Sequence, residues 1–217
     1  MPILYLLTCT GNNDIVINMT EKVLVQMRPA EDKDYYFCHN LGRRNLAPFY
    51  KRHGSGWVEE YYRNDWDKKF VLILESGENP VGYIWLELKE SREGESVYLY
   101  IHDVELNKNI EVTRNLGPYI FSSIVNAAKV ADIRIVEWAV FKDHPNMRIY
   151  RKLEGLNIVW PIKTLDDTGE IILRCDINLF FSIEHPYRNY VEAHDKEPYS
   201  TNISKLLQKQ RVRISKR

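Results

Sequence analysis

A four-residue motif directly before an apolar segment has the composition of an anion-binding turn. The segment after it shows apolar residues at helical spacing, so the motif stands at the expected start of a helix. The first turn of a helix presents unpaired N–H groups and the positive end of the helix dipole, and a glycine there lets the backbone approach a ligand closely. The residues Arg114, Asn115, Leu116 and Gly117 therefore form a helix-entry loop where an anion can bind, although R-x-x-G alone does not specify an anion site.

A second group of reactive side chains lies on the segment 97–106, whose sequence VYLYIHDVEL is typical of a strand. His102 has the side chain whose pKa lies nearest neutral pH, so it can accept a proton. Strict strand alternation predicts that Asp103 and Glu105 point to the opposite face of the sheet from His102. Only one of these faces can line a site, and a shift of register would exchange them.

The elements that must position these residues alternate between the two classes of secondary structure. We expect a first helix that begins after Pro29 and breaks near Pro48, with further helices over 57–67, 119–131 and 147–155. The order of elements predicts an α/β fold with a mixed, mostly antiparallel sheet of about seven strands, flanked by about four helices. The strands are expected at 23–28, 69–75, 81–89, 97–106, 133–141, 156–162 and 170–177.

Composition limits the classes of function. The chain has 217 residues, with 30 Lys and Arg balanced by 30 Asp and Glu, so its formal net charge is zero. This balance argues against a nucleic-acid binder, which needs a basic surplus. The three cysteines and six histidines lack the spacing of a metal site, so we expect no metal and reduced thiols. We find neither a signal peptide nor a membrane span in the sequence, and we expect a cytoplasmic protein with no membrane partner.

These motifs, in this order, resemble the GNAT superfamily of acetyl-CoA-dependent N-acetyltransferases, with bacterial-type features. RNLG at 114–117 is similar to the family's R/Q-x-x-G-x-G/A loop, and NMRIYRKLEG at 146–155 is similar to its N-x-x-A-x-x-(Y)-x-x-x-G signature. YIHDVEL at 100–106 is similar to the family's fourth strand. The resemblance covers about residues 23–177, which we expect to form the domain. It is preceded by a leader or extra strand at 1–22 and followed by an extension with a basic tail at 178–217.

The resemblance implies acetyl-CoA as cosubstrate, with its pantetheine arm between two strands that splay apart. It also implies that Tyr150 protonates the leaving thiolate and that a strand N–H near Val104 to Leu106 stabilises the oxyanion. We favour His102, or a water that it holds, as the base that takes the proton of the amine. The expected cofactor-binding residues are Val104, Leu106, Arg114, Asn115, Leu116, Gly117, Tyr119 and Asn146.

The acceptor pocket implied by the resemblance lies between the first two helices, in the aromatic and acidic stretch 45–66. Aromatic faces and carboxylates suit a cationic amine, borne by a small molecule or a peptide. Glu75, at the end of its strand, is a further carboxylate that we expect to reach the cleft. The expected substrate-binding residues are Tyr50, Trp57, Tyr61, Glu75 and Asp103. A homodimer is the assembly that we weigh beside a monomer.

Two residues depart from the family pattern in the phosphate loop. Pro118 has no N–H to donate, although proline is compatible with the first turn of a helix. We expect the ring of Tyr119 to face the region where the phosphates would sit, with basic Lys108 and Arg114 as compensation. These departures favour, as the alternative to an enzyme, a GNAT-fold binding or regulatory protein with weak or no catalysis.

Overall fold

The computed structural model describes residues 25–54, 63–64, 66–90, 97–113, 116–165, 168–185, 187–189 and 197–214. The expected leader at 1–22 and most of the expected helix at 57–67 lie outside these residues. The same holds for four predicted site residues, namely Trp57, Tyr61, Arg114 and Asn115.

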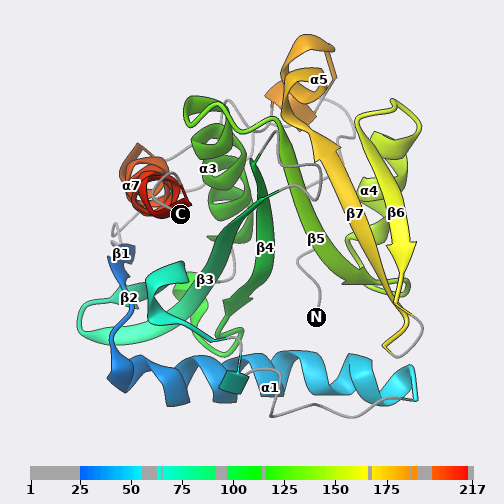
Figure 1. Cartoon of the computed structure of the whole chain (residues 1–217). Coiled ribbons are helices and arrows are strands. Elements are labelled where there is room, and N and C mark those ends of the chain that lie inside the picture. Colours follow the sequence, from blue (N-terminus) through cyan, green and yellow to red (C-terminus); the bar gives the residue numbers. More distant parts are fainter. Residues whose placement is uncertain are drawn as a thin grey trace, which may run out of the picture.

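One seven-stranded sheet runs through the molecule in the order β1-β2-β3-β4-β5-β7-β6 (Figure 1). Neighbouring strands are antiparallel except for β4 and β5, which run parallel. The prediction of a mixed, mostly antiparallel sheet of seven strands is therefore confirmed. The strands are β1 (Val25–Pro29), β2 (Val71–Ser76), β3 (Asn79–Glu90), β4 (Val97–Leu106), β5 (Ile135–Phe141), β6 (Val159–Thr164) and β7 (Glu170–Asp176).

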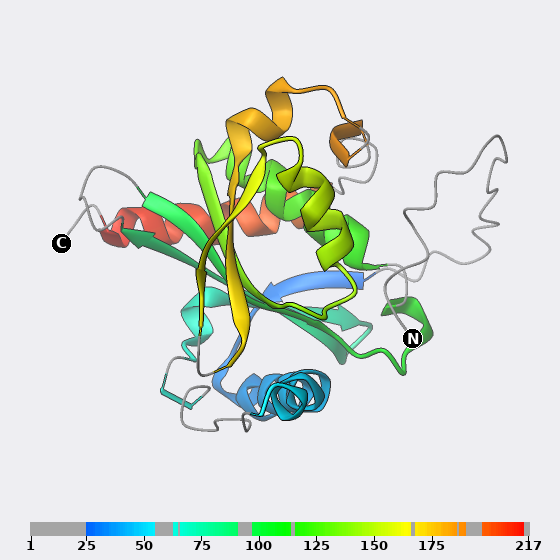
Figure 2. The same cartoon turned by 90° about the vertical axis from the view of Figure 1, so that its right-hand side faces the viewer.

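Helices cover both faces of this sheet. Helix α1 lies on one side, and α3, α4 and α7 lie on the other (Figure 2). No helix within the described ranges is long and apolar enough to cross a membrane. The helices are α1 (Tyr35–Arg52), α3 (Leu116–Val130), α4 (Met147–Glu154), α5 (Ile177–Ser182) and α7 (Glu197–Ile214), with short 3₁₀ turns at Asp32–Asp34, Lys68–Phe70 and Glu111–Thr113.

The alternation of side chains along β3 divides the interior into two cores. Ile84 and Leu86 belong to the larger core, which α3 and α7 cover. Tyr83 and Trp85 belong to the smaller core beneath α1, where they meet Cys38 and other apolar side chains. All four of these β3 side chains are fully buried, so both layers pack on β3.

Helix α1 continues through Pro48 to Arg52, so the predicted break near Pro48 is wrong. A proline inside a helix removes one backbone hydrogen bond and costs about 3 kcal/mol. The turn after it is held by tertiary contacts that the sequence does not reveal. Phe49 stacks on Phe141 of β5 with ring centroids 5.3 Å apart, and the Nε of Arg52 lies 2.9 Å from Asp143 Oδ2. These contacts stabilise the last turn of α1 after the proline.

Helix α7, from the expected extension 178–217, packs into the larger core. Ile203 and Leu207 are fully buried in that core, and Gln210 is 2% exposed. The Gln210 side chain accepts a hydrogen bond from the Leu88 N–H at 2.7 Å and donates one to the Leu86 carbonyl at 3.0 Å. The ladder between β2 and β3 stops at Trp85, so Gln210 bonds to the stretch of β3 that β2 does not reach.

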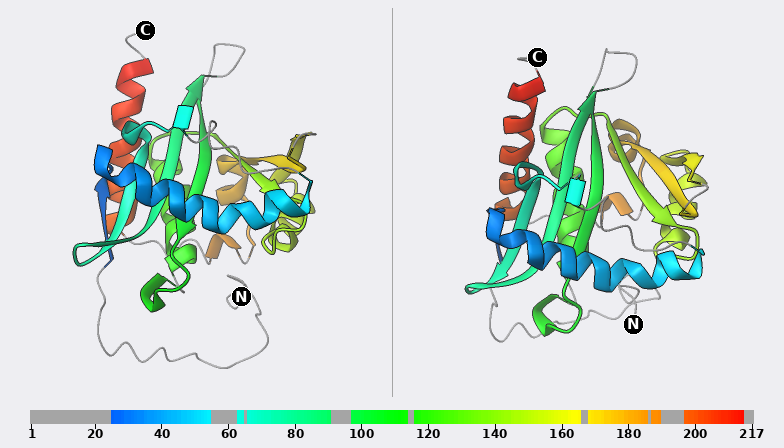
Figure 3. Two further views of the ribbon diagram at one scale, coloured as in Figure 1. Left: turned by 90° about the horizontal axis from the view of Figure 1, so that it is seen from below. Right: turned by 60° about the horizontal axis from the view of Figure 1, so that its bottom comes forward.

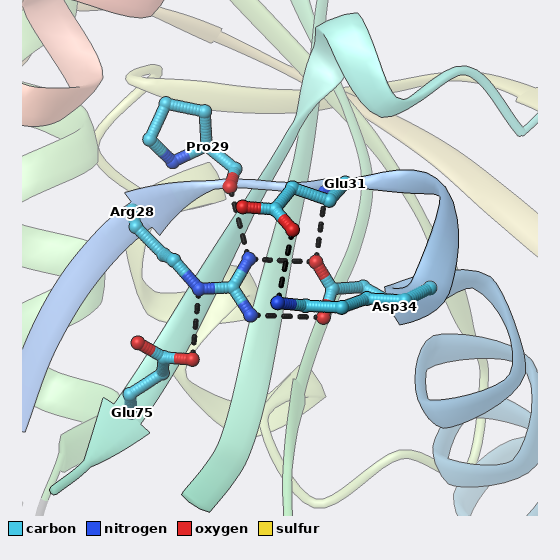
Figure 4. A network of polar contacts seen from close by, with 6 residues as sticks. Arg28, Pro29, Glu31, Asp34 and Glu75 are labelled. Carbon is cyan, nitrogen blue, oxygen red and sulfur yellow. Dashed lines mark hydrogen bonds and ion pairs between the residues drawn. The ribbon is translucent and has the colours of Figure 1, made fainter. Parts of the chain in front are cut away.

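An ion-pair network fixes the edge of the sheet to the start of α1 (Figure 4). The Arg28 guanidinium donates to both oxygens of Asp34, at 2.6 and 2.9 Å, and to Glu75 Oε1 at 2.8 Å. Burial opposes ionisation of Asp34, but the hydrogen bonds from Arg28 and the Glu31 N–H outweigh it and hold the pKa of Asp34 below its usual value. Glu75 of β2 thus forms an ion pair with Arg28. Strand β3 lies between β2 and β4.

Candidate active site

The parallel strands β4 and β5 are joined over only a short distance. Their ladder consists of three residue pairs, Leu99 with Val136, Tyr100 with Glu137, and Ile101 with Trp138. Past these pairs the two strands diverge in the direction of α1 (Figure 1). Residues 102–106 of β4 therefore have β3 as a partner on one edge and no partner in β5 on the other.

A β-bulge lies where the two strands separate. In the ladder between β3 and β4, Leu86 pairs with Ile101 and Trp85 pairs with Asp103, so His102 is an extra residue. Its ring stacks on Trp85 at 4.4 Å, while Asp103 Oδ2 accepts a hydrogen bond from the Tyr83 hydroxyl at 3.2 Å. Both partners belong to the core beneath α1, so His102 and Asp103 share that face.

The bulge overturns the assignment by strict alternation. We expected Asp103 and Glu105 on the face opposite His102, and that expectation is wrong because the extra residue resets the alternation after His102. Glu105 also faces α1, since its Oε2 accepts a hydrogen bond from Asn45 Nδ2 at 2.5 Å. Three titratable side chains of β4 consequently gather on one face, beside the edge that β5 leaves open.

Of the two carboxyl groups in this set, Glu105 is buried and Asp103 is half-buried, and they affect each other. Burial raises the pKa of Glu105 to about 7, against the opposing effects of Asn45, Lys108 and Arg44. Burial and the charge of Glu105 raise the pKa of Asp103 well above its usual value. A carboxyl group with a pKa near 7 can accept or release a proton at neutral pH.

His102 is held by three ordered contacts. Its Nε2 lies 2.8 Å from Glu87 Oε2, and its ring meets Trp85 face to face and Tyr100 edge to face. Its side chain is only 7% exposed. The hydrogen bond from His102 is the main cause that lowers the pKa of Glu87, so Glu87 remains a carboxylate partner for the ring.

Tyr150 lies on the other side of the sheet, on α4. Its ring packs against Trp138 of β5, with centroids 5.2 Å apart, and it lines a small apolar cavity together with Ile101 of β4. Burial raises the pKa of Tyr150 to about 12, although the Asn146 side chain one turn earlier lowers it. The phenol therefore keeps its proton at neutral pH. Because Ile101 and Trp138 form the last pair before β4 and β5 separate, Tyr150 lies beside the point of separation.

Comparisons with known proteins address the fold. No protein-family model and no curated protein sequence matches the chain. Among solved structures, a chain of the NatC complex bound to Gag peptide and CoA has 12% identity and a TM-score of 0.50, over 70% of this chain and 98% of that one. Ard1 from Thermoplasma volcanium has 12% identity and a TM-score of 0.50, over 70% and 97% of the two chains. A GNAT-family acetyltransferase from Listeria monocytogenes has 10% identity and a TM-score of 0.47, over 70% and 94%.

The two matches with a TM-score of 0.50 show a shared fold over 70% of this chain. The chain has the GNAT fold. The resemblance that the sequence motifs indicated is thus confirmed for the fold, and identities this low show no more than a common fold.

The GNAT fold places the start of α3 after the open end of β4. Helix α3 begins at Leu116, three residues before the expected start, so Gly117 and Pro118 both lie in its first turn. Leu116 is buried in the larger core. Its backbone N–H and those of Gly117 and Tyr119 are first-turn donors, while Pro118 has none.

Tyr119 has a different environment from the one we expected. We expected its ring to face the region of the phosphates, but the structure packs it against the core that α3 shares with α7. Its neighbour there is Tyr199 of α7, whose pKa is raised by burial and also by Tyr119. The side chain of Tyr119 therefore contributes to helix packing.

Helix α1 spans the gap between the two separated strands of the GNAT fold (Figure 3). On the β4 side, Asn45 bonds to Glu105 and also donates to the Leu106 carbonyl at 3.1 Å. On the β5 side, Tyr50 meets Phe141 edge to face with centroids 5.0 Å apart, and His53 Nε2 lies 2.9 Å from Asp143 Oδ1. Tyr50, predicted to bind substrate, thus lies at the β5 end of the gap.

The structure brings together most of the described site residues. His102, Asp103, Val104 and Leu106 lie on the stretch of β4 that lacks a β5 partner, and Asn146 and Tyr150 belong to α4 and the turn before it. It does not bring Glu75 to this group, because Arg28 binds that carboxylate two strands away. Sequence reasoning missed Asn45, and it put Glu105 on the wrong face. No glycine or proline marks the bulge at His102, so the sequence contains no local indication of it.

Proposed function

We propose that this chain is an N-acetyltransferase, which moves an acetyl group from acetyl-CoA to a primary amine of a small molecule or peptide by direct attack. One observation carries the proposal. The strands β4 and β5 separate immediately after Ile101 and Trp138, with two carboxyl groups of raised pKa on one face of the gap and a protonated Tyr150 on the other. A base and an acid on opposite sides of one opening are what acyl transfer between an amine and a thioester needs.

The residues around the gap fit acetyl-CoA. The edge of β4 over residues 102–106, which β5 leaves open, offers backbone groups that can pair with the amides of a pantetheine arm. They include those of Val104 and the N–H of Leu106, whose carbonyl Asn45 binds. The first turn of α3 offers the N–H groups of Leu116, Gly117 and Tyr119 to a pyrophosphate, and Asn146 can contact the arm near Tyr150. Arg114 and Asn115 complete this proposed set, outside the described residues. Bound acetyl-CoA would supply the activated acetyl group.

Glu105 is the proton acceptor in this proposal. An amine is mostly protonated at neutral pH and must lose a proton before it can attack. Glu105 faces the side from which the acceptor would enter, and its pKa of about 7 allows it to take that proton. The sequence favoured His102, whose Nε2 is bound to Glu87 and whose ring is stacked on Trp85. We therefore assign His102 to the wall of the acceptor side, next to Asp103.

Tyr150 is the proton donor for the leaving thiolate, and the β4 backbone stabilises the oxyanion. A thiolate leaves more readily when a neutral phenol beside it can donate a proton, and burial keeps Tyr150 neutral. The N–H groups of Val104 and Leu106 face the open edge and can stabilise the charge that develops on the carbonyl oxygen. The acceptor amine is expected to meet Tyr50 and Asp103, and Trp57 and Tyr61 belong to the same proposed pocket.

A combined binding and turnover experiment tests the proposal. The full chain is incubated with acetyl-CoA and a panel of polyamines, aminoglycosides, amino acids and peptide N-termini, and release of the free thiol is measured. We expect acetyl-CoA to raise the melting temperature and at least one amine to be acetylated. Stabilisation without transfer to any amine would support the alternative of a non-catalytic binding protein. If millimolar acetyl-CoA neither stabilises the chain nor releases free thiol, the enzyme and the non-catalytic binding protein are both refuted. Cytoplasmic location and a homodimer remain predictions.

A further inference from the structure

We propose that Asn45 of α1 is a positioning residue for Glu105, which keeps that carboxyl group oriented and sets the pH range in which it can accept a proton. The role in transfer rests on the proposed function, whereas the effect on the proton of Glu105 does not. Asn45 is the first residue of the stretch 45–66 and has no role assigned from the sequence, and the structure alone brings it to β4.

Both hydrogens of the Asn45 amide are used. Its Nδ2 donates to Glu105 Oε2 at 2.5 Å and to the Leu106 carbonyl at 3.1 Å. A carboxylate oxygen and a carbonyl oxygen both need a donor, so the amide can satisfy them only with its nitrogen toward them. The orientation of Asn45 is therefore fixed by two acceptors, and Oε2 of Glu105 receives a hydrogen bond in a fixed direction.

The second acceptor of Asn45 belongs to the open edge of β4. The Glu105 carbonyl is directed at β3, since a Cβ built on Gly82 would lie 2.7 Å from it. Successive carbonyls of a strand point to opposite edges, so the Leu106 carbonyl is directed to the edge that β5 leaves free. Asn45 thus connects α1 to this edge and orients the Glu105 carboxyl group with the same amide.

This hydrogen bond favours the ionised form of Glu105. Burial alone raises the pKa of Glu105, and the Asn45 donor is the strongest of the groups that oppose the rise. The charged groups around Glu105 are Asp103 on its own strand, Arg44 on α1, and Lys108 after β4. Asp103 in turn meets the Tyr83 hydroxyl of β3 and the charge of Glu170 on β7. Asn45 donates a hydrogen bond directly to the carboxyl group, whereas no hydrogen bond joins the cations to it. Loss of Asn45 should therefore shift the titration midpoint of Glu105 more than loss of either cation.

The test compares Asn45→Ala with Asn40→Ala, a matched change at an exposed position of the same helix. The full chain is labelled with ¹³C at glutamate carboxyl groups, and the Glu105 resonance is identified by its loss in Glu105→Gln. Its titration is followed by NMR without substrates. In the wild type we expect a midpoint near pH 7. In Asn45→Ala we expect a midpoint higher by about 1 pH unit, and in Asn40→Ala no change.

The pH profile of transfer gives the second readout. If Glu105 acts as base, the acidic limb of kcat/KM in Asn45→Ala should move upward by the same amount as the NMR midpoint, and the rate should recover at high pH. A purely structural role would lower the rate at every pH without moving the limb, and that result would overturn the positioning role. Should Asn45→Ala fail to fold, Asn45→Ser, which keeps a donor hydroxyl, carries the same comparison and is expected to show a smaller shift.

Two failures can be told apart. An unchanged Glu105 midpoint in folded Asn45→Ala would overturn the inference, whatever the enzyme does. Absence of acetyl transfer by the wild-type chain would refute the proposed function, and the NMR comparison would still decide whether Asn45 sets the protonation of Glu105.

Discussion

His102 and Asp103 are consecutive residues of one strand, yet their side chains lie on the same face of the sheet. His102 stacks on Trp85 and Asp103 bonds to the Tyr83 hydroxyl, and these β3 partners are two residues apart. The bulge that produces this arrangement occurs immediately after the last pair between β4 and β5. Titratable groups are therefore concentrated where the sheet opens, which is where a reaction would need them.

Tyr150→Phe removes the proposed acid and leaves the packing of the ring. We expect kcat to fall by about 100-fold, because general acid catalysis typically contributes a factor of this size or more. The affinity for acetyl-CoA should change little, since the ring remains against Trp138. Steady-state kinetics with the best amine of the panel measure both. Tyr36→Phe, at a side chain that is 72% exposed, is the control. An unchanged kcat would remove Tyr150 from the mechanism.

Glu105→Gln and His102→Gln discriminate between the two candidate bases. With Glu105 as base, kcat/KM of the wild type should fall about tenfold per pH unit below pH 7, because only the carboxylate accepts the proton. Glu105→Gln should lower kcat/KM by about 100-fold or more and abolish this slope. His102→Gln should keep the slope. The opposite pattern in pH–rate profiles would assign the base to His102.

Asp34→Asn weakens the network that Arg28 forms at the edge of the sheet. The folded pKa of Asp34 is lowered, so its contribution to stability is present above the unfolded pKa of about 3.9 and is lost as the pH falls through the folded value. We expect a loss of about 2 kcal/mol at pH 7. Urea unfolding at several pH values should show this difference shrinking toward pH 2. A difference independent of pH would contradict the ionic explanation.

Gly82→Ala introduces a methyl group where β3 and β4 are in close contact. The new Cβ would lie 2.7 Å from the Glu105 carbonyl oxygen and 2.8 Å from Leu106 Cδ2, so the open half of β4 must move. We expect a loss of about 1–3 kcal/mol of stability, typical of overpacking, together with reduced transfer activity. Gly155→Ala, whose nearest contact would be an ordinary 3.5 Å, is the control for thermal unfolding. Equal melting temperatures for the two variants would argue against a steric role of Gly82.

Gln210→Leu tests how α7 is attached to β3. The substitution leaves the Leu88 N–H and the Leu86 carbonyl without their side-chain partner in a buried place. We expect a loss of about 2–4 kcal/mol, since each buried unsatisfied group costs about 1–3 kcal/mol. Gln208→Leu, at an exposed position of the same helix, should be close to neutral. Denaturant unfolding of both variants gives the comparison.

Sequence patterns predict the strands and their order along the chain well, because alternation and turn residues specify strands locally. The predicted helix at 119–131 was also confirmed, with a start three residues earlier. The errors have long-range causes. The end of α1 depends on rings and ion pairs that β5 and its following turn supply, and the face of Glu105 depends on a bulge without a glycine or proline. Glu75 was assigned to the cleft because the sequence does not reveal its partner Arg28, 47 residues earlier.

The attachment of α7 to β3 has a consequence for the order of assembly. Helix α7 follows all seven strands in the chain, yet Ile203 and Leu207 complete the core beside strands made much earlier. During synthesis, all seven strands therefore leave the ribosome before α7 does, and the face of the sheet near β1 and β3 is still exposed to water at that stage. A nascent chain stopped before residue 197 should expose this apolar face to chaperones and proteases, and release of the last helix should end that exposure.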